Sequence, residues 1–285
     1  MSTTSGFALE VGRELSYDQL PAYAPMLAAY HRAHADELRA MLADLPLAPG
    51  AIVLDMACGA GTYTCWLAEL VGEAGRVVGV DIAPAYLAQA REAADRTPYN
   101  ARINFQQGDV AALPFDNHTF DLVWCAQSMY SLPDPHAALR ELRRITRVGG
   151  TVAIFENDTV HQLVLPWPAE LELAVRSAQL RALRSAHGDN ERFFIGRELC
   201  SSFEAAGFTT CSVRSYATTR HAPLSRDEYA YLRAYLDDLA ARARPFLTAN
   251  ECAWLDQLIT PGTADYMLDQ SDFYVTYLSM VALGE

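Results

Sequence analysis

The chain has 285 residues, of which 51% are hydrophobic, and its 35 acidic against 22 basic side chains give a formal net charge of −13. This length suits one large α/β domain or a core with a cap, and the negative charge disfavours nucleic acid and anionic membranes as partners. No stretch approaches the roughly twenty apolar residues of a membrane span. The six scattered cysteines form no CxxC pair and residues 1–12 lack a signal-peptide pattern. We therefore expect a cytoplasmic protein with reduced thiols and no metal site.

The first predicted elements form a strand, a glycine-bearing turn, a helix and a second strand. An apolar strand over residues 52–55 ends in Asp55, and a turn containing Gly59 and Gly61 leads into a helix. The next strand ends in Asp81, twenty residues past Gly61. Glycine lets a ligand approach the backbone closely, and an acid at the second strand tip can reach a ribose diol. This order predicts a nucleotide-type cofactor site.

The charges around this turn favour one class of cofactor. A dinucleotide fingerprint needs a third small residue, but that position is Thr64. A pyrophosphate would also meet the like charge of Asp55. S-adenosylmethionine has a cationic ammonium and sulfonium that suit an acidic strand end, and its carboxylate suits a helix N-terminus. We therefore expect S-adenosylmethionine rather than NAD.

Strands and helices alternate through the rest of the first half, which is typical of a parallel, doubly wound sheet. The loop after the third strand carries Asp109, and Asp134 with Pro135 is typical of a helix start. Gly207 is expected to follow the end of a later helix. The expected strands cover residues 52–55, 77–81, 103–106, 120–125, 151–156, 208–216 and 272–283, and the expected helices cover 64–71, 135–150 and 196–206.

Three further segments, 16–45, 157–195 and 217–271, are largely helical by pattern. In the first, apolar residues and two histidines recur every three or four positions from Leu27 to Leu45, which indicates one helical stripe. Helices placed before the first strand, after the fifth and before the last would meet at the carboxyl ends of the strands, where open α/β sheets bind ligands. We expect these segments to form a cap.

At this point the chain resembles the class I S-adenosylmethionine-dependent methyltransferases, in particular their small-molecule, ubiquinone/menaquinone-biosynthesis-like branch. The resemblance covers residues 51–156 and, more loosely, 197–216. It implies an α/β, doubly wound, Rossmann-like seven-stranded sheet whose last strand is antiparallel and lies between strands five and six. It also implies a single methyltransferase domain over 1–285, with a core of about 46–156, 196–216 and 272–285.

The same resemblance implies roles for individual residues. Tyr130 points toward the transferring methyl group, and Tyr130 and Ser131 stand where relatives often carry paired histidines. Cofactor contacts are implied for Tyr17 over the methionine end, for Asp55, Ala57, Gly59 and Gly61 in the loop under the methionine part, for Asp81 at the ribose and Ile82 beside the adenine, for Asp109 and Val110 at the adenine edge, and for the Cys125 carbonyl at the ammonium.

Three residues are candidates for catalysis: Tyr130, His161 and His31. His31 lies on the apolar stripe of the first helical segment, where packing in the core is its ordinary role and orientation or deprotonation of the acceptor is the functional one. His161 follows the fifth strand, where a general base could reach the crevice. The sulfonium is already an excellent leaving group, so a base is needed only when the acceptor must lose a proton.

These observations predict methyl transfer from S-adenosylmethionine to a small, largely apolar or aromatic metabolite in biosynthesis, secondary metabolism included, with S-adenosylhomocysteine as product. The expected partner is this small-molecule acceptor, not nucleic acid, and the sequence allows a homodimer. Two alternatives stay open. One is a cyclase or isomerase that keeps S-adenosylmethionine or S-adenosylhomocysteine as a non-reacting ligand, and the other is a non-catalytic, cofactor-binding regulatory subunit. Formation of S-adenosylhomocysteine separates methyl transfer from both.

Overall fold

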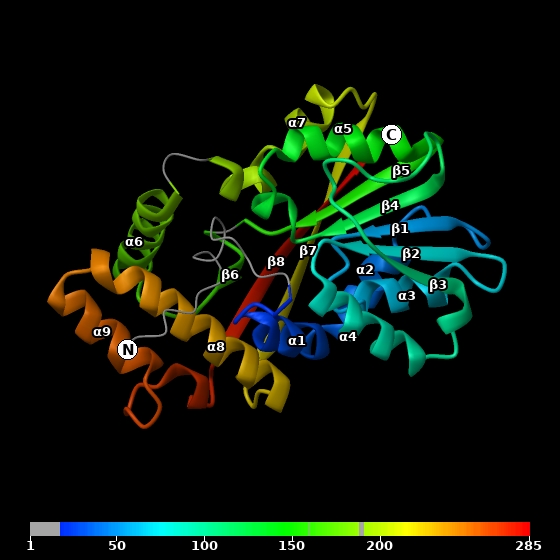
Figure 1. Cartoon of the computed structure of the whole chain (residues 1–285). Coiled ribbons are helices and arrows are strands. Elements are labelled where there is room, and N and C mark those ends of the chain that lie inside the picture. The colour runs from blue at the N-terminus through cyan, green and yellow to red at the C-terminus, as the bar shows by residue number, and fades with distance from the viewer. Residues whose placement is uncertain (1–17, 159, 188–190) are drawn as a thin grey trace.

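The centre of the molecule is a mixed, twisted sheet in the order β3-β2-β1-β4-β5-β8, with β7 paired to the far side of β8 (Figure 1). A computed structural model describes residues 18–158, 160–187 and 191–285. The strands are β1 (Ile52–Met56), β2 (Arg76–Asp81), β3 (Ile103–Gln107), β4 (Phe120–Ala126), β5 (Thr146–Glu156), β6 (Leu163–Val164), β7 (Cys211–His221) and β8 (Tyr274–Gly284).

Helices cover both faces of this sheet and extend past one of its ends. The α-helices are α1 (Ala24–Ala33), α2 (Ala35–Ala43), α3 (Thr62–Leu70), α4 (Pro84–Asp95), α5 (Pro135–Ile145), α6 (Ala169–His187), α7 (Leu199–Ala205), α8 (Arg226–Ala243) and α9 (Ala249–Ile259). The short 3-10 helices are η1 (Asn100–Arg102), η2 (Met129–Ser131), η3 (Glu191–Arg197), η4 (Arg244–Phe246) and η5 (Met267–Asp269). The expected start of α5 is confirmed, because the Asp134 side chain accepts a hydrogen bond from the Ala137 N–H.

The five strands from β1 to β5 are parallel to their neighbours, so their carboxyl ends lie along one edge of the sheet. Because β1 pairs with β2 on one side and β4 on the other, the chain changes direction between β1 and β4. A crevice at such a switch point is the usual ligand site of an open α/β sheet. The doubly wound fold predicted from the sequence is confirmed, including an antiparallel β8 between β5 and β7.

The structure corrects three details of the prediction. The described sheet has eight strands rather than seven, because the two-residue β6 pairs with β8 at Leu163. Strand β5 begins at Thr146 rather than at 151. Thr146 pairs with Phe120 before the register shifts, and Gly149 at φ +73° allows this bulge. The stripe expected over 27–45 is divided between α1 and α2, since the backbone at His34 leaves the helical region.

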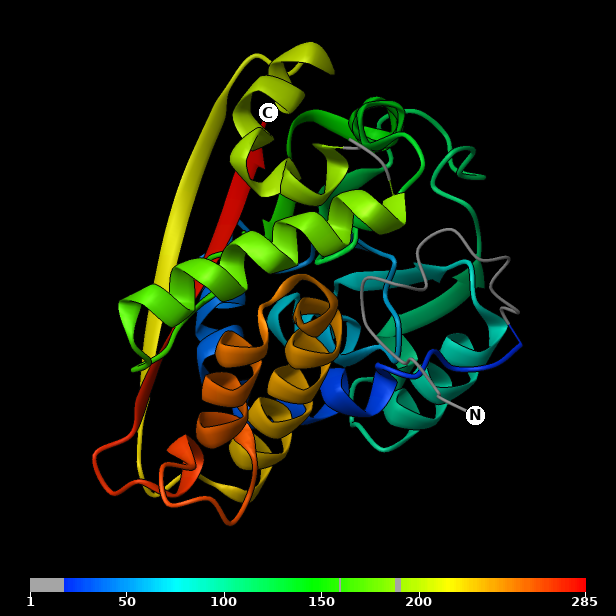
Figure 2. The ribbon, with the colours of Figure 1, turned by 90° about the vertical axis from the view of Figure 1, so that its left-hand side faces the viewer.

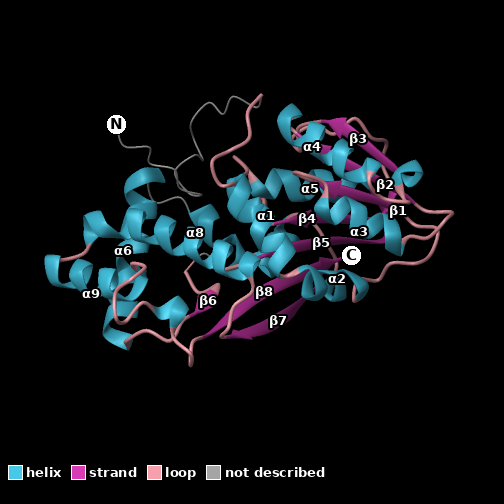
Figure 3. Cartoon of the chain, turned by 90° about the horizontal axis from the view of Figure 1, so that it is seen from below, coloured by secondary structure: helices cyan, strands magenta, loops and turns pink. Residues whose placement is uncertain are grey.

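Two hydrophobic clusters lie on opposite faces of the sheet. One packs α1, α2, α3 and α8 against residues such as Trp124 and Phe155, and the other packs α5 and α7 against residues such as Val123 and Ile154. Helices α6, α8 and α9 stand beyond the carboxyl edge of the sheet, and Figures 2 and 3 show them beside the long β7–β8 ribbon. We propose that these helices, with α1, form the cap expected from the sequence.

Candidate cofactor and acceptor sites

The loop between β1 and α3 has an unusual backbone. Ala57, Gly59 and Gly61 all have positive φ, at 56°, 52° and 77°. A Cβ atom on Gly61 would lie 2.9 Å from the Ala90 Cβ atom, so this glycine lets the loop pack against α4. A Cβ atom on Gly59 would meet nothing within 4 Å. The loop is therefore close-packed on its α4 side and open at Gly59, where a ligand can approach the backbone.

Asp81, at the end of β2, connects that strand to the glycine loop. Its side chain is buried, with 7% of its surface exposed, and it accepts hydrogen bonds from the Gly59 N–H at 2.8 Å and the Ala83 N–H at 2.9 Å. Burial raises the pKa of this carboxyl, while the backbone N–H groups lower it. A carboxylate has about four lone-pair sites. At least one lone-pair site therefore remains for a ligand hydroxyl beside the backbone bonds.

Asp55 lies beneath the loop rather than at its mouth. It is 1% exposed, and its Oδ2 atom accepts a hydrogen bond from the Thr64 hydroxyl at 2.5 Å. Burial raises the pKa of this carboxyl to about 7, and the charge of Asp81 adds to the rise. The hydrogen-bond donors to both acids are neutral N–H and O–H groups, so a cationic ligand end would stabilise their charged forms. This chemistry fits S-adenosylmethionine.

The remaining predicted cofactor residues lie along the same edge of the sheet. Ile82 is 37% exposed next to Asp81, and Val110 is buried after β3. Asp109 is exposed, and its carboxylate accepts a hydrogen bond from the Ala111 N–H. Cys125 is buried within β4. Tyr17 lies outside the described residues.

A cavity opens beside the ends of β4 and β5, between helices α1, α6 and α8. Its cavity volume is about 90 Å³. Its lining includes the aromatic and charged side chains of Tyr30, Tyr130, Glu156, Tyr235, Asp238 and Arg242. The wall combines four tyrosines and two apolar side chains with amide and charged groups, and aromatic surface with convergent polar groups is typical of a small-molecule pocket. We call this cavity the cap pocket.

Tyr130 and Glu156 form the part of the cap pocket nearest the sheet. Glu156 ends β5, is 2% exposed, and accepts a hydrogen bond from the Met129 N–H at 2.7 Å. Burial raises the pKa of this carboxyl to about 8. Tyr130 follows Met129 in η2, and burial raises the pKa of its hydroxyl as well. Both groups therefore hold their protons near neutral pH, and Glu156 positions the turn that carries Tyr130.

Comparison with known proteins identifies the part of the chain that runs from β1 to the start of β5. Residues 53–150 match the family model described as a methyltransferase domain. This region is a class I S-adenosylmethionine-dependent methyltransferase domain. The resemblance drawn from the sequence is thereby confirmed, and S-adenosylmethionine is the cofactor of the domain.

Individual relatives of the methyltransferase domain cover different lengths of the chain. An uncharacterized methyltransferase of Schizosaccharomyces pombe is 36% identical over 172 residues, which is 59% of this chain and 60% of that protein. A 2-phytyl-1,4-naphtoquinone methyltransferase of Thermosynechococcus vestitus is 42% identical over 112 residues, 39% of this chain and 48% of that protein. The chain thus spans about half to three fifths of the length of these curated relatives.

Solved structures extend the likeness of fold beyond the methyltransferase domain. The crystal structure of geranyl diphosphate C-methyltransferase from Streptomyces coelicolor superposes with a TM-score of 0.51 at 15% sequence identity. The alignment covers 91% of this chain and 82% of that one. At this identity the match shows a shared fold.

The structure separates His31 from the cap pocket. Its ring lies 5.1 Å from the ring of Tyr63 and 6.4 Å from that of Trp66, both on α3. Burial lowers the pKa of His31 to about 4, so the imidazole is neutral. His31 is not among the residues that line the cap pocket, although its neighbour Tyr30 is. This placement corresponds to packing between α1 and the methyltransferase domain.

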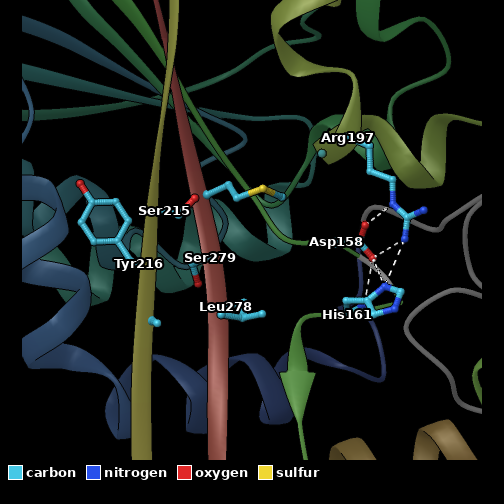
Figure 4. Close-up of a pocket in the computed structure, with 10 residues that line it drawn as sticks. Asp158, His161, Arg197, Ser215, Tyr216, Leu278 and Ser279 are labelled. Carbon is cyan, nitrogen blue, oxygen red and sulfur yellow. Dashed lines mark hydrogen bonds and ion pairs between the residues drawn. The ribbon is translucent and has the colours of Figure 1, made fainter. Parts of the chain in front are cut away.

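His161 lies in a different pocket, which is bounded by β7, β8 and η3 (Figure 4). Its Nδ1 atom is 3.3 Å from the Asp158 carboxylate and 3.2 Å from the Arg197 guanidinium, and its side chain is 62% exposed. Asp158 and His161 thus line one cavity, whereas Asn157 and Gln162 line the cap pocket. The structure therefore does not bring His161 together with Tyr130 in one pocket.

Several polar residues of the cap pocket were not singled out from the sequence. Gln127 follows β4 and lines the pocket. Its backbone has a φ of +49°, and no local sequence pattern predicts this conformation. Tyr235, Asp238 and Arg242 recur at helical spacing on α8, which could have indicated one shared face. Which cavity that face meets depends on how α8 packs.

Two further findings concern the described residues. They contain no group of three or more His, Cys, Asp or Glu side chains that could hold a metal ion. Within the same ranges, no helix has the length and apolar character needed to cross a membrane. The cytoplasmic location and the homodimer stay predictions.

Proposed function

We propose that the whole chain transfers a methyl group from S-adenosylmethionine to a small, largely apolar or aromatic acceptor. The observation that carries this proposal is the continuity between the two sites. Cys125 belongs to the predicted cofactor set, and Gln127 and Tyr130, a few residues later, line the cap pocket. A cofactor held over the glycine loop would therefore present its methionine end toward this pocket.

The protein's task in such a reaction is mainly to bind and align. When bound, S-adenosylmethionine supplies an electrophilic methyl group on a sulfonium. Asp81 and the open backbone at Gly59 would hold the cofactor, and buried Asp55 would favour its cationic end. The aromatic side chains of α1 and α8 would exclude water and align the acceptor, which accounts for most of the acceleration in a methyl transfer.

Methyl transfer is supported over both alternatives by the names of the relatives, which are methyltransferases. The test is to incubate the full chain with S-adenosylmethionine and a panel of neutral aromatic and terpenoid compounds. Mass spectrometry should detect S-adenosylhomocysteine in equal amount to a product that has gained one methyl group. Asp81→Asn serves as the cofactor-site variant, and Glu92→Gln on the exposed surface of α4 serves as the matched control. Conversion of a compound without S-adenosylhomocysteine formation would establish the cyclase or isomerase alternative instead.

A further inference from the structure

One face of α8 carries polar groups into the cap pocket. Tyr231, Tyr235, Asp238 and Arg242 follow one another at steps of four, three and four, so they form a single stripe, and all of them line the pocket. The start of α8 is held by a capping box between Ser225 and Glu228. The position of this stripe is therefore set by a well-anchored helix.

The pocket wall contains buried polar atoms that have no hydrogen-bond partner among the described residues. Among them are the Tyr235 Oη atom and the Asn157 Oδ1 atom. Tyr235 is buried, with a relative exposure of only 3%. Buried polar groups in proteins are almost always hydrogen-bonded. Two unpaired polar atoms in one cavity wall therefore point to a ligand that supplies the missing partners. A hydroxyl group can do so, since it both accepts and donates a hydrogen bond.

The charged groups of the pocket are already compensated. Arg242 forms an ion pair with Asp238 at 2.5 Å, and their side chains are only 8% and 10% exposed. An anionic acceptor would have to compete with Asp238 for this guanidinium, and breaking a buried pair is unfavourable. Protonated Glu156 adds no charge near neutral pH. The pocket therefore favours a ligand without net charge.

We infer that Tyr235 and Asn157 are specificity-determining residues that together recognise one hydroxyl group of an uncharged aromatic acceptor. The Tyr235 O–H donates a hydrogen bond to the acceptor's hydroxyl oxygen, and the hydroxyl donates its own hydrogen to Asn157 Oδ1. This inference rests on the proposed function, because it takes the cap pocket as the acceptor site.

Equilibrium dialysis of the full chain against three probes, with and without S-adenosylhomocysteine, tests the inference. The probes are a naphthol, the methylnaphthalene of the same shape and the corresponding naphthoate. The wild-type protein should prefer naphthol over methylnaphthalene by about fivefold to a hundredfold, the range of two uncharged hydrogen bonds, and should bind naphthoate least. Tyr235→Phe and Asn157→Leu should each reduce the preference toward parity. Tyr229→Phe on the same helix should retain it, because the Tyr229 hydroxyl contacts that of Tyr266 at 3.0 Å outside the pocket.

Equal binding of naphthol and methylnaphthalene by the wild type, a preference for naphthoate, or no binding of any probe would overturn the inference. An unchanged preference in Tyr235→Phe would do the same. Unaltered S-adenosylhomocysteine affinity in each variant, measured by calorimetry, shows that the variant is folded. Probe preference does not depend on methyl transfer, so a wild-type protein that selects naphthol but never forms S-adenosylhomocysteine would contradict the proposed function alone.

Discussion

Replacing Glu156 by glutamine should make the folded protein increasingly more stable than the wild type as the pH rises. Glu156 is buried at the end of β5, and its pKa is raised from 4.5 to about 8. Between these two pH values the folded state keeps a proton that the unfolded state has lost, so the folded state binds more protons and rising pH lowers stability. The loss amounts to about 1.4 kcal/mol per pH unit and to about 5 kcal/mol over the whole interval. The glutamine side chain does not titrate, and its amide oxygen can still accept the hydrogen bond from the Met129 N–H.

Urea unfolding followed by tryptophan fluorescence measures this effect. At about pH 5 and about pH 7, the advantage of Glu156→Gln over the wild type should differ by about 2.7 kcal/mol. Comparing the two proteins at each pH cancels the contributions of other titrating groups, Asp55 included. Glu92→Gln, which removes an exposed ion pair with Arg96, should follow the wild type within about 0.5 kcal/mol. Parallel pH curves for Glu156→Gln and the wild type would show that Glu156 is charged in the folded protein and would refute the reasoning.

Three other substitutions test the cofactor site. Asp81→Ala should abolish measurable S-adenosylmethionine binding in calorimetric titration, because it removes both the proposed ribose contact and the bond to the Gly59 N–H; wild-type affinity in a folded variant would contradict the assignment. Asp55→Asn should weaken S-adenosylmethionine more than adenosine in the same titration, and equal losses would indicate a purely structural acid. Gly61→Ala should abolish cofactor binding and lower the free energy of unfolding by about 2 kcal/mol or more, because its Cβ atom would lie 2.9 Å from a neighbour. Gly72→Ala has a similar positive φ of 71° but open space around its Cβ atom, so it should cost only about 1 kcal/mol and leave binding intact; equal effects of the two glycine variants would contradict the packing argument.

The sequence by itself determined the cofactor half of this protein. Alternating apolar strands and helices predicted the doubly wound sheet, and acids at the ends of β1 and β2 with Gly59 and Gly61 between them predicted S-adenosylmethionine. These features are local: a strand, its turn and the next helix lie within about thirty residues of one another, as in any βαβ unit. The carboxyl ends of parallel strands then meet at one edge whatever covers the sheet. For that reason Asp55, Asp81 and Asp109 could be assigned to one edge before the fold was described.

Only the tertiary structure decided which residues form the cap pocket. His31 and His161 were chosen for their residue type, yet one packs against α3 and the other faces the β7–β8 ribbon. Tyr130 and Tyr235 lie more than one hundred positions apart in the sequence but line the same cavity. Helical periodicity shows which residues of α8 share a face, but the partner of that face depends on long-range packing against α1 and α6. Because each helix can bury its apolar stripe against several surfaces, the pocket emerges only when all of these contacts are satisfied together.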